Sequence, residues 1–154
     1  MPGRKKNQKI PKKRKKHIKR NKGRGKGKGK DPVRLYNMEI VPYGQTLFWS
    51  FAPTPQLLHE EIKRTLPHLT PTHIEPDTRA HCEIFNYEGS WFPVIWVSQP
   101  DKPWLIAHEL EHYVHWLLGL RGLTYNDSSE EAYAYLISFI MEMMIESRRP
   151  NRYS

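Results

Sequence analysis

The sequence has a single cysteine and no long apolar run. Cys82 alone excludes an internal disulfide and any metal cluster built from the thiolates of one chain. No stretch of about 18 apolar residues is present, and the N-terminus lacks the apolar segment of a secretory signal. We therefore expect a cytoplasmic protein that neither spans a membrane nor is secreted.

Acidic residues are absent from the first 30 residues. This segment carries 16 of the 25 Lys and Arg residues, whereas the rest of the chain carries 9 basic residues and all 16 acidic ones. The two parts therefore have charges near +16 and, from 9 − 16, near −7. A segment so rich in like charge cannot bury enough apolar surface to offset its ordering entropy. We expect residues 1–31 to form a disordered basic tail and residues 32–154 to form one domain.

Aromatic residues are also absent from this tail, which argues against base stacking. Its positive charges would instead contact phosphates and release counterions, giving salt-sensitive binding to nucleic acid with little sequence preference. An acidic protein partner, the acidic domain itself or a role in solubility are the alternatives. The residues predicted to bind nucleic acid are Lys12, Lys13, Arg14, Lys15, Lys16, Lys19 and Arg20.

The order of apolar patterns and turn signals predicts an α+β fold with a small, mostly antiparallel sheet. Residues 33–51 predict two strands around a turn at 42–45, and residues 81–98 predict a hairpin around Glu88-Gly89-Ser90. A first helix is expected over 56–66, after Thr54 and Pro55, and a second over 104–118. Asp127 and Glu130 form a capping-box pattern that predicts a third helix ending near residue 147.

The second predicted helix contains the sequence AHELEHYVHW, residues 107–116. Its histidines and glutamates fall on one side of a helical wheel, and large apolar residues fill the other. His108 and His112 are four residues apart, a spacing that directs two imidazoles at one point on a helix, where tetrahedral Zn²⁺ fits. Glu109, one residue on, is placed to reach water at such a metal. The segment therefore predicts a zinc site of the H-E-x-x-H type.

A catalytic zinc site needs a third protein ligand, and the start of the third predicted helix supplies a candidate. Glu131 follows His112 with 18 residues between them, and the connecting loop is long enough to bring the two helices side by side. Because Asp127 and Glu130 would satisfy the helix start, we expect Glu131 to be free to bind the metal.

HELEH followed by EEAYA resembles the gluzincin class of zinc metallopeptidases and, more closely, the small zincin-like proteins of bacteriophages. The resemblance covers about residues 92–145 well, the region 32–91 only in the order of strands and helix, and the tail not at all. It implies a minimal zincin-like domain with one Zn²⁺ per chain, held by His108, His112 and Glu131. Glu111 departs from the pattern, because peptidases of this class usually have an uncharged residue there.

The resemblance further implies that Glu109 is the general base in the hydrolysis of a peptide bond. Donors to the oxyanion, or groups that orient the ligands, could be Tyr133, Tyr135 or His115, with Tyr125 a further candidate, and the sequence does not choose among them. The strand expected over residues 92–98 is the candidate for pairing with an extended substrate.

We therefore expect a zinc-dependent metallopeptidase that acts on a protein or peptide substrate. A phage origin would place it in the cytoplasm of a bacterial host, near nucleic acid through residues 1–30. Two other functions fit the same features. One is a non-catalytic nucleic-acid-binding protein with a structural zinc site, and the other is a zincin-like adaptor or inhibitor of a host protein.

Overall fold

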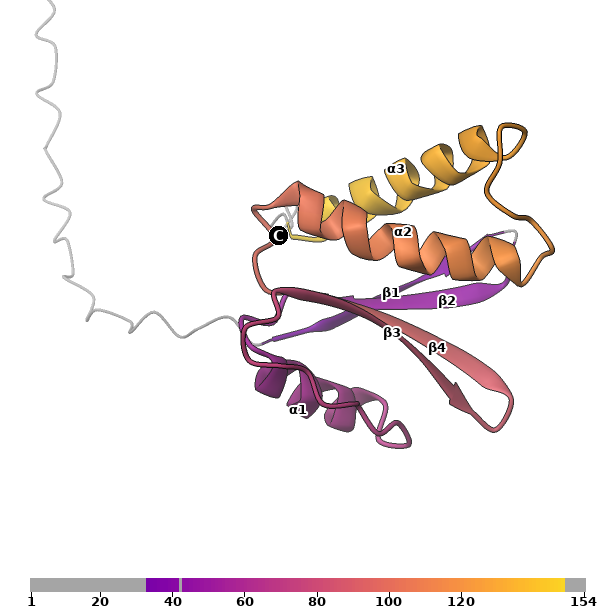
Figure 1. Cartoon of the computed structure of the whole chain (residues 1–154). Coiled ribbons are helices and arrows are strands. Elements are labelled where there is room, and N and C mark those ends of the chain that lie inside the picture. Colours follow the sequence, from indigo (N-terminus) through magenta and orange to yellow (C-terminus); the bar gives the residue numbers. More distant parts are fainter. Residues whose placement is uncertain (1–32, 42, 149–154) are drawn as a thin grey trace, which may run out of the picture. The chain divides into compact units, whose positions relative to one another are not determined.

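The computed structural model describes residues 33–41 and 43–148, which form four strands and three helices (Figure 1). They are β1 (Leu35–Ile40), β2 (Gln45–Ser50), α1 (Pro55–Thr65), β3 (Ala80–Tyr87), β4 (Ser90–Val97), α2 (Pro103–Gly119) and α3 (Glu130–Glu146). The predicted tail over residues 1–31 and the domain boundary at Pro32 lie outside the described residues.

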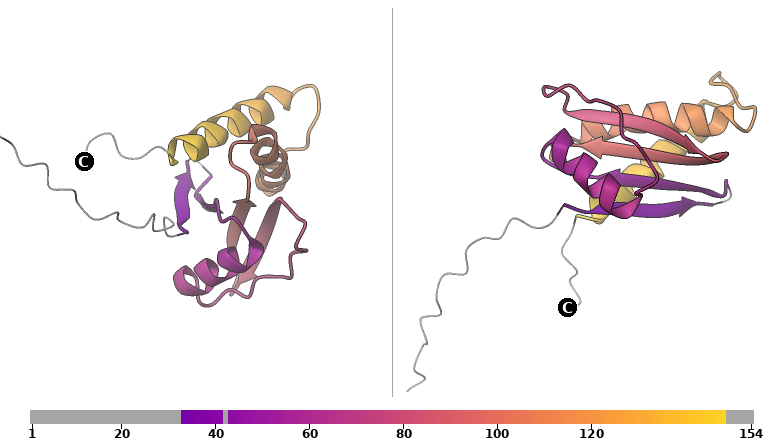
Figure 2. Two further views of the ribbon diagram at one scale, coloured as in Figure 1. Left: turned by 90° about the vertical axis from the view of Figure 1, so that its left-hand side faces the viewer. Right: turned by 90° about the horizontal axis from the view of Figure 1, so that it is seen from below.

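The strands form one mixed sheet in the order β1-β2-β4-β3. Antiparallel pairing joins β1 to β2 and β3 to β4, while β2 and β4 run parallel. The helices cover both faces of the sheet, with α2 and α3 on one face and α1 on the other (Figures 1 and 2). The predicted α+β class and mostly antiparallel sheet are therefore confirmed.

Both predicted hairpins are present, and the turn of the second supplies the backbone that a tight reversal needs. Tyr87 pairs with Ser90, and the two residues between them, Glu88 and Gly89, have φ of 50° and 80°. Positive φ at both central positions is the requirement of a type I′ turn, which glycine meets at no steric cost. The turn therefore fixes the register of β3 against β4.

Strand β4 separates two apolar cores, which explains why its sequence is apolar at successive positions. Val94 and Trp96 pack with α1, whereas Ile95 and Val97 pack with α2 and α3. Successive side chains of a strand point to opposite faces of the sheet, so a strand covered on both faces is buried throughout. Trp96 also donates its indole N–H to the Ala52 carbonyl, at 2.7 Å.

Helix α1 begins and ends where its sequence predicts. The Thr54 hydroxyl accepts a hydrogen bond from the backbone N–H of Leu57 at 3.4 Å, and Pro55 occupies the first turn. The helix ends at Thr65, two residues before Pro67, which cannot continue it.

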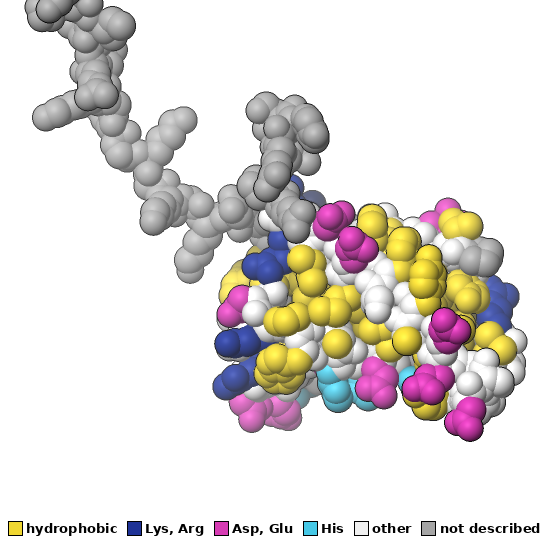
Figure 3. Space-filling view, turned by 90° about the horizontal axis from the view of Figure 1, so that it is seen from above, with side chains coloured by type: hydrophobic (Ala, Val, Ile, Leu, Met, Phe, Trp, Pro, Cys, Tyr) yellow, Lys and Arg dark blue, Asp and Glu magenta, His cyan; other side chains and the backbone are white. Residues whose placement is uncertain are grey.

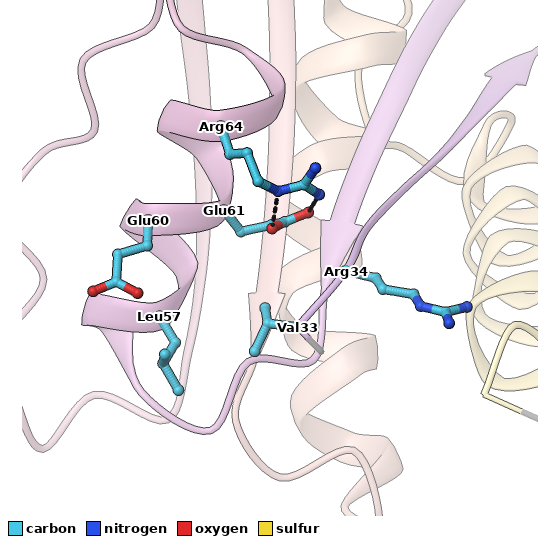
Figure 4. A pocket seen from close by; sticks show the side chains of 6 residues that line it. All are labelled: Val33, Arg34, Leu57, Glu60, Glu61 and Arg64. Carbon is cyan, nitrogen blue, oxygen red and sulfur yellow. Dashed lines mark hydrogen bonds and ion pairs between the residues drawn. The ribbon is translucent and has the colours of Figure 1, made fainter. Parts of the chain in front are cut away.

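A cavity of about 530 Å³ lies beside α1 at the start of β1 (Figure 4). Its central carboxylate, Glu61, is nearly buried and accepts hydrogen bonds from Arg64, Thr65 and the backbone N–H of Leu35. Hydrogen bonding to Arg64 lowers the pKa of Glu61. Because these donors already satisfy the carboxylate, we assign this region the structural role of holding β1 to α1.

Helix α2 confirms the prediction for residues 104–118, but α3 begins later than predicted. Its first residue is Glu130, and Ser129 occupies the N-cap position, so the capping box of Asp127 with Glu130 is wrong. The Ser129 hydroxyl accepts from the backbone N–H of Asn126 at 3.0 Å and donates to the Thr124 carbonyl at 2.6 Å. This turn organises the start of α3 without the Glu130 side chain.

None of the helices in residues 33–41 and 43–148 is long and apolar enough to cross a membrane.

Candidate metal and peptidase site

Four of the five histidine and glutamate residues of α2 lie on the exposed side of the helix. His108, Glu111, His112 and His115 are all exposed. The opposite side is buried by Ile106, Leu110, Tyr113, Val114, Leu117 and Leu118. Histidine and acidic side chains gather along one edge of the face formed by α2 and α3, beside a broad apolar area (Figure 3). The expected separation of a polar and an apolar side is therefore present for these four residues, whereas Glu109 is buried.

His108 and His112 bring their imidazoles together on this polar side. The two Nε2 atoms lie 3.3 Å apart, and the rings are nearly perpendicular, with an interplanar angle of 86°. Two nitrogens at about 2.0–2.1 Å from a tetrahedral zinc ion would be about 3.3–3.4 Å apart. The distance therefore fits two ligands of one zinc ion, although a hydrogen bond between the rings would have the same length.

Glu109 lies beside this pair, but it is buried, with 6% of its surface exposed. Its carboxylate accepts a hydrogen bond from the backbone N–H of Cys82 on β3. Burial raises the pKa of Glu109, and the nearby imidazoles of His108, His112 and His81 offset part of that rise. A carboxylate with a raised pKa is a better proton acceptor near neutral pH, which is the property that a general base needs.

Glu131 is exposed and does not join the histidines. Within the described residues, no group of three His, Cys, Asp or Glu side chains is placed to hold one metal ion. Side chains two positions apart in a helix differ by about 200° around its axis. Glu131 therefore points away from the side on which Tyr133 is buried. The structure thus brings together two of the three predicted ligands, His108 and His112, and leaves the third, Glu131, apart from them.

Glu130, rather than Glu131, faces α2. It lines a cavity of about 360 Å³ between α2 and α3. The other lining residues are Glu111, His115, Tyr125, Tyr133, Ala134 and Ile137. Sequence reasoning missed Glu130 because it assigned that side chain to the helix cap. The later helix start at Ser129 leaves Glu130 available to the cavity.

Three of the four candidate oxyanion donors or orienting groups belong to this cavity. The rings of His115, Tyr125 and Tyr133 contact one another, with centroids 4.7–5.6 Å apart. The Tyr133 hydroxyl donates its proton to the Leu123 carbonyl at 3.2 Å, so this proton is not available to an oxyanion. Negative charge on Glu130, the largest contribution, raises the pKa of Tyr125.

Tyr135 lies elsewhere on α3. It is 71% exposed, and its ring stacks on Phe139 with centroids 6.5 Å apart. Together with Val41 and Ala132 it lines a separate cavity next to the turn between β1 and β2. This position separates Tyr135 from the polar side of α2.

The strand expected to pair with a substrate is not at an edge of the sheet. β4 is an interior strand, paired with β3 along its whole length and with β2 at Val94, Ile95 and Trp96, so the prediction that residues 92–98 pair with a substrate is wrong. The edge strand next to α2 is β3, which contacts that helix through Cys82 and Glu109. A substrate strand adding to the sheet beside the site would therefore pair with β3.

The basic residues predicted to bind nucleic acid, from Lys12 to Arg20, lie outside the described residues. No known protein family, curated protein or solved structure matches this chain. The functional argument therefore rests on the chain's own side chains.

Proposed function

We propose that this chain is a zinc-dependent metallopeptidase, with His108 and His112 as two of its zinc ligands. The observation that carries the proposal is the 3.3 Å distance between their Nε2 atoms, with the buried Glu109 beside them. Zn²⁺ bound there would polarise a substrate carbonyl and lower the pKa of water to about 7.

Glu109 accepts the proton of the attacking water in this proposal and returns it to the leaving amine. Two features support the role. Its pKa is raised by burial, and its hydrogen bond to the backbone N–H of Cys82 fixes the carboxylate on the β3 side of the histidines. The same hydrogen bond places the carboxylate next to the strand whose free edge could align a peptide.

Glu131 is the proposed third ligand, because it lies 18 residues beyond His112 in the E-E-A-Y-A segment that resembles the gluzincin pattern. Its carboxylate is exposed, and among the described residues no hydrogen bond or ion pair to it is present. The role requires that carboxylate to turn toward the two imidazoles when the ion binds. Glu130 is the rival ligand, since it already faces α2.

We further propose that the basic segment of residues 1–30 holds the enzyme near nucleic acid, in the cytoplasm of a bacterial host if a phage encodes it. The support is the concentration of 16 Lys and Arg residues without an acidic one. The protein or peptide substrate would then be one that meets the enzyme on nucleic acid.

The deciding measurement is elemental analysis of protein purified without a histidine tag, followed by a peptidase assay of the wild type and of Glu109→Gln. The proposal expects one zinc per chain in both proteins and hydrolysis only in the wild type. Zinc without hydrolysis in the wild type would favour a structural zinc site or an adaptor. Absence of zinc from the wild type, even after incubation with ZnCl₂, would overturn the proposal.

A further inference from the structure

The cavity between α2 and α3 combines negative charge with aromatic walls. Glu111 contributes a carboxylate from α2, and Glu130 contributes one from α3. Its volume, about 360 Å³, lies within the range of about 300–1,000 Å³ that is typical of small-ligand sites. No lysine or arginine is among the residues that line it, so its two carboxylates have no cationic partner within the cavity.

The aromatic walls favour a cationic ligand. Tyr125 and Tyr133 meet edge to face, with an interplanar angle of 87° and centroids 5.1 Å apart, and His115 lies against both rings. The face of a tyrosine ring carries partial negative charge and attracts cations within about 6 Å. A positive group bound here would therefore exchange its water molecules for contacts with two carboxylates and with these rings.

The potential metal ligands that line this cavity do not converge on one point. Glu111, His115 and Glu130 line one cavity, yet no three potential ligands of the described residues are placed to share an ion. A compact ion needs its ligands at about 2.0–2.6 Å, whereas a planar guanidinium spreads its charge over several donors. Separated carboxylates suit the larger cation.

We propose that this cavity binds the guanidinium of an arginine side chain in the peptide substrate. Arginine presents a planar fork that pairs with carboxylates and stacks on aromatic rings, whereas the ammonium of lysine is a compact and strongly hydrated charge. The inference rests on the proposed function, because it assumes that the occupant belongs to a peptide that the site above would cleave.

The position of the cavity along α2 supports this assignment. Glu111 precedes His112 directly, and His115 lies three residues beyond it on the same exposed side. One helical turn spans about 5.4 Å, so an arginine in the cavity would sit about one turn from the proposed zinc site. This arrangement also gives a role to Glu111, the residue that departs from the peptidase pattern.

The first test measures binding of three peptides to the full-length chain carrying Glu109→Gln, so that no cleavage occurs. The peptides are acetyl-Ala-Arg-Ala-amide and its citrulline and lysine counterparts, and their dissociation constants are measured by titration calorimetry. Citrulline keeps the shape of arginine but has no charge. We expect the arginine peptide to bind at least about tenfold more tightly than the citrulline peptide. Equal binding of the two would overturn the proposal, and equal binding of the lysine peptide would overturn the guanidinium assignment.

Matched substitutions locate the binding site. Glu111→Gln and Glu130→Gln should each weaken arginine binding about five- to tenfold with little effect on the citrulline peptide. Glu142→Gln is the control, because Glu142 is an exposed residue of α3 outside the cavity. An equal loss of affinity in Glu142→Gln would mean that the overall negative charge of the domain, rather than this cavity, attracts the peptide, and would overturn the proposal.

The aromatic wall is tested with Tyr125, which is exposed enough to be changed without disturbing the core. Tyr125→Phe keeps the ring and should retain arginine binding, whereas Tyr125→Leu should weaken it about threefold or more. Equal binding of the arginine peptide by the two variants would show that the Tyr125 ring does not contribute to binding, and would overturn the aromatic part of the proposal.

Repeating the titrations in EDTA separates this inference from the proposed function. Preference for arginine that persists in EDTA, together with an untreated wild type that holds no zinc and cleaves no peptide, would sustain the cation site and overturn the peptidase. Hydrolysis by the wild type without any preference for arginine would sustain the peptidase and overturn the cation site.

Discussion

The carboxylate of Glu109, in α2, accepts a hydrogen bond from the backbone N–H of Cys82, in the edge strand β3. This contact joins the helix that carries the candidate site to the strand with a free edge. It also places a negative charge next to the only cysteine of the chain. Both residues therefore provide tests of the arrangement.

Cys82 should be almost unreactive in the folded protein. Burial, together with negative charge on Glu109 and Glu83, raises the pKa of its thiol to about 12, so the nucleophilic thiolate is scarce at pH 8. Alkylation by iodoacetamide, followed by mass spectrometry, should be at least about 100-fold slower in the native protein than in guanidinium chloride. Equal rates in the two conditions would contradict the raised pKa of this thiol.

Glu109→Gln should abolish peptidase activity while keeping the metal. Loss of a general base typically lowers kcat by about 100- to 10,000-fold. Glutamine retains an oxygen that can accept the Cys82 N–H, so thermal unfolding should change little. The measurement is kcat beside zinc content for the two proteins, and a variant with wild-type kcat would exclude Glu109 as the base.

The zinc ligands are distinguished by paired substitutions. His108→Ala, His112→Ala and Glu131→Gln should each weaken zinc binding by at least about 100-fold, because a direct ligand contributes more than its supporting residues do. His115→Ala and Glu130→Gln change the rival groups and should retain zinc, and Glu142→Gln, at an exposed residue of α3, is the control. Zinc affinity is measured by competition with a chelating dye. Loss of zinc in Glu130→Gln but not in Glu131→Gln would transfer the ligand role to Glu130 and exclude the arginine site.

Acid should destabilise the contact between α1 and β1. The folded pKa of Glu61 is lowered from its ordinary value of 4.5, first by hydrogen bonding to Arg64. The stability that the ionised carboxylate contributes is therefore fully present above about pH 4.5 and is lost as pH falls through the lower folded pKa. Free energies of unfolding in urea between pH 3 and pH 7 should fall more steeply for the wild type than for Glu61→Gln. Parallel profiles would contradict the lowered pKa.

Nucleic-acid binding should depend on the basic segment and on salt. Changing the seven basic residues between Lys12 and Arg20 to Gln should reduce the slope of log K against log salt concentration by up to about 6, at about 0.9 per phosphate contact on duplex DNA. The control changes Arg34, Lys63 and Lys102 of the domain, which are all exposed, to Gln. Fluorescence anisotropy with a labelled duplex, over a range of salt concentrations, measures the affinity of both variants for DNA. An unchanged slope in the first variant would exclude this segment as the binding element.

Most of the secondary structure could be predicted because its signals are local. Thr54 and Pro55 fix the start of α1, and the Glu88-Gly89 turn fixes the second hairpin, each through residues adjacent in sequence. The length of residues 104–118 and their lack of helix breakers predicted α2, a helical wheel predicted its polar side, and the spacing of His108 and His112 predicted that their imidazoles meet. None of these features needs a distant contact.

One error concerns a relationship between elements, and another concerns a local choice at a helix start. The apolar run of β4 indicated a buried strand, but only the strand order shows that β2 and β3 occupy both of its edges. Asp127 and Glu130 matched a capping box by spacing, but a turn held by Asn126, Ser129 and the Thr124 carbonyl starts the helix instead. A spacing rule cannot choose between two local hydrogen-bonding arrangements.

The sequence by itself determined the helices and strands and the paired histidines, because backbone preferences and helical spacing act over a few residues. Only the tertiary structure decided which strand is left at the edge beside α2, and that Glu130 rather than Glu131 faces that helix. The reason is that burial of Tyr133, Leu136 and Ile140 sets the rotation of α3 about its axis. A rotation of one residue, about 100°, is enough to exchange the two glutamates.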